Sequence, residues 1–388
     1  MKTVQLARTS ALAAAVAIAG AAAPLQVDAQ RASGVSNGIA WEAQSRIVGT
    51  TSTGPVNPPG TGNPIYAASQ PAYSGVVSLI MTQANGSRFI CSGTLLPDRV
   101  SILTAGHCVS SGFGTANPVS TTVYFPGSDA DAVVHTTPGN ASRTVTQYIV
   151  HPGYTGEVID QNDIAILRLN APAPASALSY GLFTPPALAG TNFNVAGYGQ
   201  RTSIGGDAGA NLGTGVLRQG DNRYEFRFGD ADFNGFWTNR NPNTGRNFFG
   251  LANIDFSYVS DFDNGLAAND AACLIAAGVG VAAVNRPRFC NLGRGAREVS
   301  VAGGDSGGPQ FVNGLISSVT SYGLSFGANF GDIGGGLNSS FGEFNGFVPV
   351  YIHAAFINRA LVPEPATYVL FGTGLVVIGF MARRRRLS

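Results

Sequence analysis

Three short strings contain residue types that could act together as one catalytic group. The string TAGHC contains His107, NDIAIL contains Asp163, and GDSGGP contains Ser306, in that order along the chain. A serine hydroxyl is a useful nucleophile only when a positioned base takes its proton, and a histidine base needs a carboxylate that fixes its tautomer. The three strings therefore predict acyl transfer by Ser306, with His107 as base and Asp163 as the acid that orients it.

The composition excludes other ways of activating Ser306. The single lysine, Lys2, lies in a segment that we expect to be removed, which excludes a serine–lysine pair in the mature protein. No HExxH or paired CxxC spacing indicates zinc, and we expect neither a metal nor a cofactor. His107 is the best placed base because it follows the apolar run Val100–Leu103 and precedes a cysteine. The alternative is a buried structural histidine at this position. The histidines of the chain are His107, His135, His151 and His353.

The bulk composition is typical of a loop-rich β protein outside the cytoplasm. The chain has 388 residues, 44% of them hydrophobic and only 12% charged, with 52 glycines. A net charge of +1 without a basic patch argues against nucleic acid as a partner. The expected partner is a protein or peptide substrate.

The amino terminus indicates export. Lys2 and Arg8 precede the apolar run Ala11–Ala23, and Val27–Ala29 offers a cleavage site of small residues, so we expect a signal peptide at 1–29. Export implies an oxidising compartment, where four cysteines indicate two disulfides with three possible pairings.

The three strings closely resemble those of the trypsin-like (chymotrypsin-fold) serine proteases, and the resemblance runs from Ile47 to Leu361. It implies an all-β fold of two antiparallel six-stranded Greek-key barrels, with the active site between them and a short C-terminal helix. It also implies an oxyanion hole formed by the backbone N–H groups of Gly304 and Ser306. By the same resemblance we favour the disulfides Cys91–Cys108 and Cys273–Cys290.

The resemblance also suggests a specificity pocket without charge. Ser300 occupies the position of the pocket base, where trypsin has an aspartate, and Ala302 replaces a frequent cysteine. The backbone of Ser321, Tyr322 and Gly323 is expected to pair with the substrate. A wall position that is usually glycine aligns with Pro349. We expect a preference for uncharged, apolar or small residues, unless Asp332 or Glu343 from an insertion reaches the pocket.

Residues 30–46 have the position of a pro-segment. In the family, cleavage before a residue equivalent to Ile47 frees an ammonium that binds an aspartate equivalent to Asp305, and this orders the oxyanion hole. Arg46 before Ile47 indicates such a site, cut by an activating protease. The alternative is that Arg46-Ile47 is ordinary linker and that Asp305 is satisfied otherwise.

Alternation and β-branched content predict the strands and the helix of a protease domain at 47–361. Residues 200–272 and 324–346 depart from the family, and long loops of this kind either surround the cleft or lie away from it. Asp261–Gly265 resembles part of a calcium loop but lacks its spaced ligands and closing glutamate. The predicted strands are Gly75–Met81, Arg88–Ser92, Val100–Thr104, Thr121–Phe125, Arg143–Val150, Ile164–Leu169, Phe193–Tyr198, Phe311–Val319 and Phe347–His353, and the helix is Ala354–Leu361.

The carboxyl end, residues 362–388, indicates a second targeting signal. Val362–Pro365 contains Pro-Glu-Pro, and the apolar run Tyr368–Met381 is shorter than the roughly 20 residues of a bilayer span. Arg383–Arg386 follows. The three parts resemble a PEP-CTERM sorting signal, which implies transient membrane anchoring, processing by an exosortase-like enzyme, and a cell-envelope or extracellular location. The alternative is a simple tail anchor.

The sequence thus predicts a secreted serine endopeptidase. One alternative is a catalytically silent homologue that acts as a surface or matrix binding protein. Another is an esterase with the same triad. The GDSGGP string differs from the GxSxG elbow of esterases, and the order His-Asp-Ser differs from their order Ser-Asp-His.

Overall fold

The computed structural model describes residues 31–44, 47–54, 62–127, 135–136 and 140–361. The expected signal peptide and the expected sorting tail lie outside these residues. None of the helices in the described ranges has the length and apolar character needed to cross a membrane.

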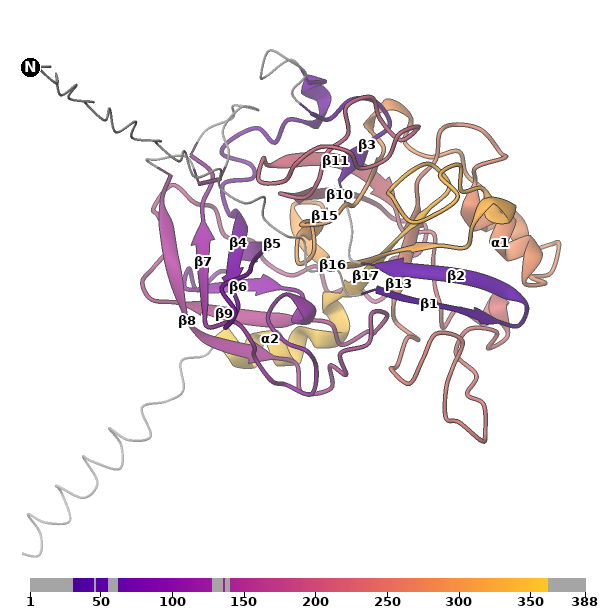
Figure 1. Cartoon of the computed structure of the whole chain (residues 1–388), viewed down its shortest axis with the longest axis horizontal. Helices are drawn as coiled ribbons and strands as arrows, with labels where there is room; N and C mark the ends of the chain where they lie inside the picture. The colour runs from indigo at the N-terminus through magenta and orange to yellow at the C-terminus, as the bar shows by residue number, and fades with distance from the viewer. Residues whose placement is uncertain (1–30, 45–46, 55–61, 128–134, 137–139, 362–388) are drawn as a thin grey trace, which may run out of the picture.

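The first half of the described chain closes into a six-stranded antiparallel barrel, with the strands in the order β4-β5-β6-β9-β8-β7 (Figure 1). Its hairpins follow from local signals: β4 and β5 are joined through Asn85-Gly86, where Gly86 has a φ of 83°. The strands are β4 (Val76–Thr82), β5 (Arg88–Leu95), β6 (Ser101–Thr104), β7 (Ser120–Tyr124), β8 (Ser142–Val150) and β9 (Ala165–Leu169).

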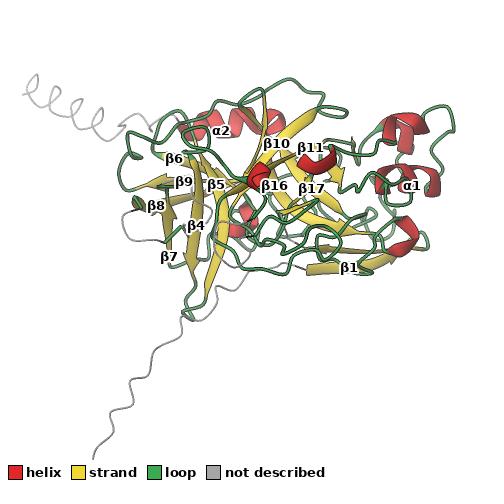
Figure 2. Cartoon of the chain, turned by 90° about the horizontal axis from the view of Figure 1, so that it is seen from above, coloured by secondary structure: helices red, strands yellow, loops and turns green. Residues whose placement is uncertain are grey.

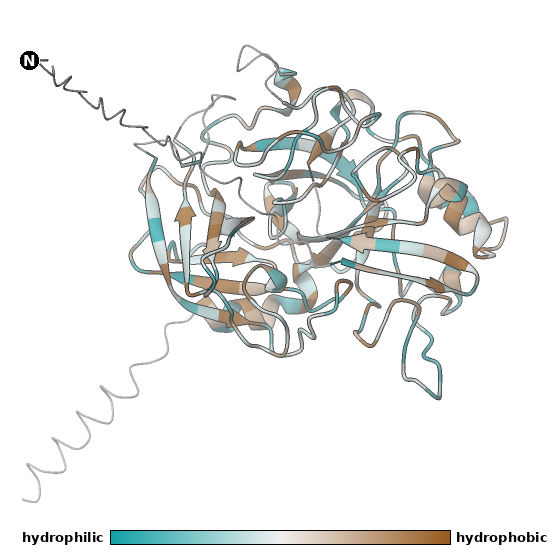
Figure 3. Cartoon of the chain, in the orientation of Figure 1, coloured by the Kyte–Doolittle hydropathy of each residue, from teal (hydrophilic) through white to brown (hydrophobic). Residues whose placement is uncertain are grey.

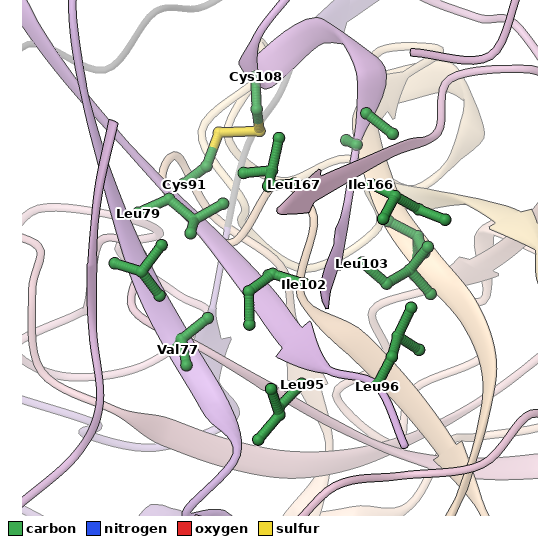
Figure 4. Packing of buried hydrophobic residues seen from close by; sticks show 14 of the residues in the cluster. Val77, Leu79, Cys91, Leu95, Leu96, Ile102, Leu103, Cys108, Ile166 and Leu167 are labelled. Atoms are coloured by element: carbon green, nitrogen blue, oxygen red, sulfur yellow. A yellow bond between two sulfur atoms is a disulfide. The ribbon is translucent and has the colours of Figure 1, made fainter. Parts of the chain in front are cut away.

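The barrel interior is filled by aliphatic side chains of its strands. Leu79, Leu103 and Ile166 are fully buried there, and the Cys91–Cys108 disulfide closes one side of the cluster (Figure 4). Apolar residues gather on these strands (Figure 3). A dry, close-packed interior of this kind holds the strand ends that carry the candidate site in fixed positions.

The second half forms a nine-stranded sheet with the main order β11-β10-β15-β16-β17-β13-β12, and β1 and β2 join it through β16. Figure 2 shows it beside the barrel, with β10, β16 and β17 at the junction. Its strands are β1 (Arg31–Ser36), β2 (Ile39–Gln44), β10 (Asn192–Gly197), β11 (Arg218–Arg223), β12 (Phe226–Arg227), β13 (Tyr258–Asp261), β15 (Pro309–Val312), β16 (Leu315–Ser325) and β17 (Phe344–Pro349).

The predicted mostly-β, antiparallel class and the terminal helix α2 (Ala354–Leu361) are confirmed. The second sheet has nine strands instead of the six expected, and the hairpin of residues 31–44 adds two of them. A separate two-stranded sheet pairs β3 (Val48–Gly49) with β14 (Val299–Ser300). The remaining helices are α1 (Ala271–Gly278) and the 3-10 turns η1 (Pro64–Tyr66), η2 (Gly106–Cys108), η3 (Ala231–Phe233), η4 (Arg286–Phe289), η5 (Gly295–Arg297), η6 (Ala328–Phe330) and η7 (Val350–His353).

Two predicted strands differ from the structure. The predicted strand 311–319 is a hairpin of β15 and β16, because Asn313 and Gly314, with φ values of 52° and 76°, form a two-residue turn. The predicted strand 347–353 is shifted, since β17 begins at Phe344 and the chain turns into η7 after Pro349.

Candidate active site

His107 and Asp163 form a buried acid–base pair. His107 lies in η2, directly after β6, and its Nδ1 lies 2.7 Å from Asp163 Oδ2. The backbone N–H of His107 donates to Asp163 Oδ1 over 2.7 Å, and the hydroxyl of Ser321 donates to Asp163 Oδ2 over 2.5 Å. Only 4% and 2% of the two side chains are exposed. A carboxylate on Nδ1 fixes that nitrogen as the donor and leaves Nε2 as the basic atom.

Neighbouring strands bring this pair together. β6 and β9 are adjacent and antiparallel, with Thr104 opposite Ala165, so the end of one strand meets the start of the other. Gly106 lets the connecting turn lie close to the carboxylate, because a Cβ at this position would lie 3.1 Å from Asp163 Oδ1. The TAGHC and NDIAIL strings therefore meet because of strand pairing.

Ser306 lies in the loop between β14 and β15, next to the same pair. Its carbonyl accepts a hydrogen bond from the backbone of Ser92 over 2.8 Å, which ties the loop to the barrel. Cys108 Sγ lies 3.7 Å from this carbonyl oxygen and 4.0 Å from His107 Nε2, so the Cys91–Cys108 bridge borders both residues. Gly307, with a φ of 81°, permits the sharp turn, since a Cβ would lie 2.0 Å from Thr104 Oγ1.

The backbone around Ser306 has the form of an anion-binding loop. Gly304 has a φ of 103°, a conformation that favours glycine. The N–H groups of Asp305 and Gly307 donate to backbone carbonyls over 2.9 and 2.8 Å. The N–H groups of Gly304 and Ser306, by contrast, donate to no protein acceptor within the described residues. Two such donors are suited to hold a developing negative charge.

Asp305 is fully buried and accepts only backbone hydrogen bonds. Gly199 N–H donates to its Oδ1 and Ala302 N–H to its Oδ2, each over 2.8 Å. The backbone nitrogen of Ile47 also lies against Oδ2. Burial raises the pKa of Asp305 well above its usual range, although two of these N–H groups favour the ionised form. The structure thus brings together Ile47 and Asp305, the two activation residues that it describes, while Arg46 lies outside the described residues.

Ser300, which we expect at the base of the pocket, is bound to a neutral residue that the sequence did not indicate. The Ser300 hydroxyl lies 2.7 Å from Asn345 Oδ1, which also accepts the backbone N–H of Val301 over 2.9 Å. Asn345 lies opposite Gly323 in the pairing of β16 with β17, whereas Pro349 lies opposite Ser318. The assignment of Pro349 to the pocket wall was therefore wrong. No motif marks Asn345, because its place depends on strand register.

The two acids of the insertion are engaged in their own loop. Glu343 accepts backbone hydrogen bonds from Asn338, Ser339 and Ser340 over 2.8, 2.9 and 3.0 Å, and burial raises its pKa to about 8. Asp332 accepts the backbone N–H of Gly334 over 2.7 Å. Both acids therefore have local partners and do not hydrogen-bond to Ser300.

The segment expected to bind substrate lies at the junction of the two halves, and part of its strand already pairs with another strand. Ser321, Tyr322 and Gly323 are in β16, with Ser321 on Asp163. The strand β2 pairs antiparallel with the next part of β16, where Gly323 lies opposite Gln44 and Ser325 lies opposite Glu42. An extended peptide added to a sheet edge forms the same kind of pairing. The hairpin β1–β2 thus pairs with the strand at which we expect the substrate to bind.

The two segments that depart from the family, residues 200–272 and residues 324–346, both contact this hairpin. Trp41 packs edge-on against Phe249, with ring centroids 5.0 Å apart, and Trp237 packs on Phe326 at 5.6 Å. These rings and Ala43 belong to one buried cluster. Residues 200–272 and 324–346 therefore lie next to the part of β16 that pairs with β2, and they are not insertions far from the candidate site.

The other histidines have structural partners. His135 lies 2.6 Å from the Ser78 hydroxyl and stacks on Tyr124, and burial lowers its pKa to about 4. The rings of His151 and His353 contact each other at 4.7 Å, and burial lowers the pKa of both, that of His353 to about 4. Their contacts leave His107 as the histidine beside Ser306. Both favoured disulfides, Cys91–Cys108 and Cys273–Cys290, are formed.

Comparisons with known proteins find similarity over part of the chain. The trypsin family model matches residues 62–225, which include His107 and Asp163 but end before Ser306, and the PEP-CTERM protein-sorting motif matches residues 361–386. A solved structure titled HL collagenase is 20% identical, with a TM-score of 0.46, over 76% of this chain and 96% of its own.

Two curated relatives match part of the chain. Alkaline trypsin B of Manduca sexta is 31% identical over 126 residues, 32% of this chain and 42% of the relative. The inactive CLIP domain-containing serine protease A3 of Aedes aegypti is 30% identical over 124 residues, 31% of this chain and 25% of the relative. The chain thus spans less than half the length of the curated relatives it matches. The chain thus contains a region similar to trypsin-like serine proteases, at residues 62–225, and carries a PEP-CTERM sorting motif at its carboxyl end.

Proposed function

We propose that the mature chain is a secreted serine endopeptidase that uses His107, Asp163 and Ser306. The observation that carries the proposal is the Nδ1-bound pair of His107 and Asp163 beside a serine whose own N–H has no protein acceptor in the described part. A histidine that was merely structural would not need a buried carboxylate, an adjacent serine and two unused donors in one place.

In the proposed reaction, Ser306 Oγ attacks the carbonyl carbon of the scissile peptide and His107 Nε2 takes the hydroxyl proton. Asp163 stabilises the resulting imidazolium, and the N–H groups of Gly304 and Ser306 bind the oxyanion. The C–N bond then breaks, and His107 gives its proton to the leaving amine. Water repeats the sequence on the acyl-enzyme, which releases the acid and restores Ser306.

The first test is turnover of internally quenched peptides by the exported protein after cleavage before Ile47. An endopeptidase cleaves internal bonds, and the cleavage stops when a fluorophosphonate is added. The alternative, a silent homologue that acts as a surface binding protein, is supported by the inactive relative of Aedes aegypti. It predicts no turnover by the cleaved protein on any member of the library.

We expect the pocket to disfavour basic side chains. Ser300 and Asn345 hydrogen-bond to each other and supply no charge to a buried Arg or Lys. An unpaired buried cation costs several kcal/mol, so kcat/KM for peptides with Phe, Leu or Ala before the cleaved bond should exceed that for Arg by about 100-fold or more.

Matched peptides that differ only at this residue measure the preference. Ser300→Asp should raise relative turnover of the Arg peptide, while Ser300→Ala should not. A wild-type preference for Arg would contradict the assigned role of Ser300. Asp332→Asn and Glu343→Gln would then show whether either acid is responsible.

We also propose that residues 30–46 are an inhibitory pro-segment. The hairpin β1–β2 pairs with β16 at Gly323, where the substrate backbone is expected, and Trp41 anchors it among aromatic side chains. A neutral pocket would not accept Arg46 as a cleavage residue. The cut before Ile47 is therefore assigned to a separate activating protease of basic specificity.

Export and sorting complete the proposal. The PEP-CTERM motif indicates sorting to the cell envelope, and we propose that residues 1–29 are removed as a signal peptide. The tail 362–388 would hold the protein in the membrane transiently, until an exosortase-like enzyme processes it.

A further inference from the structure

Five carboxylates are buried together behind the pocket, in a part of the second sheet that takes no part in the proposed chemistry. They come from the residue before β12, from the end of β13 and the loop after it, from the residue that precedes helix α1, and from the residue before β14. Exposed fractions are between 0% and 4% for all of them. One ligand oxygen from each of Asp261, Asp263 and Asp270 lies within 4.8 Å of the other two. The five residues are Glu225, Asp261, Asp263, Asp270 and Glu298.

At least one oxygen of four of these carboxylates is held by the protein, and both oxygens of Glu298 are, since its Oε2 accepts the N–H of Arg294. Asp261 Oδ2 accepts the N–H of Ala272 over 2.7 Å, and Asp270 Oδ1 accepts that of Cys273 over 2.9 Å. Glu298 Oε1 accepts the N–H of Asp263 over 2.6 Å, and the amide of Asn291 donates to Glu225 Oε1 over 2.7 Å. These bonds fix the orientation of the carboxylates.

Two oxygens of the cluster have no hydrogen-bond partner although they are buried. They are Asp263 Oδ1 and Glu225 Oε2. A buried oxygen without a partner costs about 1–3 kcal/mol, more when it is charged, so such an atom in a folded protein indicates a missing ligand. Asp263 is 97% and Glu225 96% buried, from exposed fractions of 3% and 4%, so bulk water does not supply that ligand.

The charge of the cluster is not balanced by side chains of the described residues. The nearest ion pair is Arg223 Nε to Glu225 Oε1, at 4.0 Å. Arg294 contributes a weak attraction to Glu298. Ionised carboxylates that are buried together need an opposite charge, which a bound cation would supply.

We propose that Asp261, Asp263 and Asp270 bind a calcium ion, with Glu225 next to them. All the donors are hard oxygens, and Ca²⁺ takes six to eight of these at about 2.3–2.6 Å in flexible geometry. Mg²⁺ demands a near-ideal octahedron and keeps several waters, which a buried site built from separate segments of the chain does not favour. The loop that contains Asp261 and Asp263 does not have enough ligands of its own. The fold supplies further carboxylates from other segments of the chain.

The location gives the ion a role in the specificity pocket. Asp261 lies opposite Phe344 in the pairing of β13 with β17, and the adjacent pair joins Ser260 to Asn345 at the pocket base. Glu298 directly precedes β14, and its carbonyl accepts the N–H of Thr50 next to the activation strand β3. Calcium would thus join the α1 segment to the pocket and to the segment that follows Ile47.

Direct binding to the exported protein tests the site without relying on activity. After EGTA treatment, calorimetric titration with CaCl₂ should show one Ca²⁺ per chain. A Ca²⁺ concentration 100 times Kd should raise the thermal unfolding midpoint by about 5 °C, and the same concentration of MgCl₂ should not.

Two isosteric variants distinguish between two roles for these carboxylates: binding the metal ion, or only stabilising the fold. Asp263→Asn removes charge at the oxygen without a partner, so Ca²⁺ affinity should fall at least tenfold while the unfolding midpoint in EGTA does not fall. Asp270→Asn keeps an equally good helix N-cap and should weaken Ca²⁺ in the same way. Asp207→Asn, at an exposed carboxylate, is the matched control and should bind Ca²⁺ as the wild type does.

Equal midpoints in CaCl₂, MgCl₂ and EGTA, with no heat of Ca²⁺ binding, would overturn the proposal. Wild-type Ca²⁺ affinity in both Asp263→Asn and Asp270→Asn would also overturn it. Neither outcome depends on whether the protein is a peptidase, because both are measured on the folded protein without substrate.

Discussion

Ser306→Ala lowers peptide turnover by a factor on the order of 10⁵ and leaves the fold intact. Only the nucleophilic oxygen is lost, and the carbonyl of Ser306 that ties the loop to Ser92 remains. The measurement is kcat/KM of the cleaved protein on a peptide amide, together with its thermal unfolding midpoint. Ser120→Ala, at an exposed serine, is the control and should keep wild-type turnover.

The other two members of the triad extend this prediction. His107→Ala should match Ser306→Ala, because a serine without its base is not activated. Asp163→Asn keeps the size of the side chain but favours the wrong histidine tautomer, so turnover should fall about 10⁴-fold. The double variant of Ser306 and His107 should be no worse than either single one. Turnover by Ser306→Ala within tenfold of the wild type would refute the assignment.

Arg46→Gln should hold the protein in an inactive form when a protease of basic specificity is added. Activity should stay at least about 100-fold below that of the cleaved wild type, which corresponds to ~3 kcal/mol. In the continuous chain the nitrogen of Ile47 at Asp305 is an uncharged amide, whereas cleavage makes it an ammonium that can neutralise the buried carboxylate. Cleavage also frees the hairpin from its covalent link to the strand that it covers.

Peptide turnover and amino-terminal sequencing before and after limited proteolysis measure this switch. Asp305→Asn is a second variant for the same experiment. It should be cut in the same way as the wild type, but it offers no carboxylate to the new ammonium and should therefore remain inactive. Full activity of an uncut precursor, without a new terminus at Ile47, would show that the pairing with Asp305 is not a switch.

The sequence predicted the parts of the site that are carried by contiguous strings. His107, Asp163 and Ser306 lie where neighbouring strand ends and one glycine-rich turn bring them, and both disulfides form as favoured. Such strings encode local geometry, for example the glycine at 307 that a close contact with Thr104 requires. Their order along the chain was enough to indicate the fold.

Features that depend on register or on distant segments were not predicted. Asn345 reaches Ser300 only through the pairing of β16 with β17. The five buried acids come from segments between 225 and 298, and no local pattern connects them. The hairpin at 31–44 was missed for a different reason: Asn37-Gly38, with φ values of 50° and 79°, is a turn signal of the same kind as Asn313-Gly314, and neither was recognised.

The most direct test of the triad is labelling of the cleaved protein with a fluorophosphonate, followed by mass spectrometry of its peptides. The account predicts one label per chain, on Ser306, and no label on Ser306→Ala or His107→Ala, because only a serine activated by its base reacts at a useful rate. A cleaved, folded wild-type protein that takes no label, or that carries it on another residue, would contradict the account.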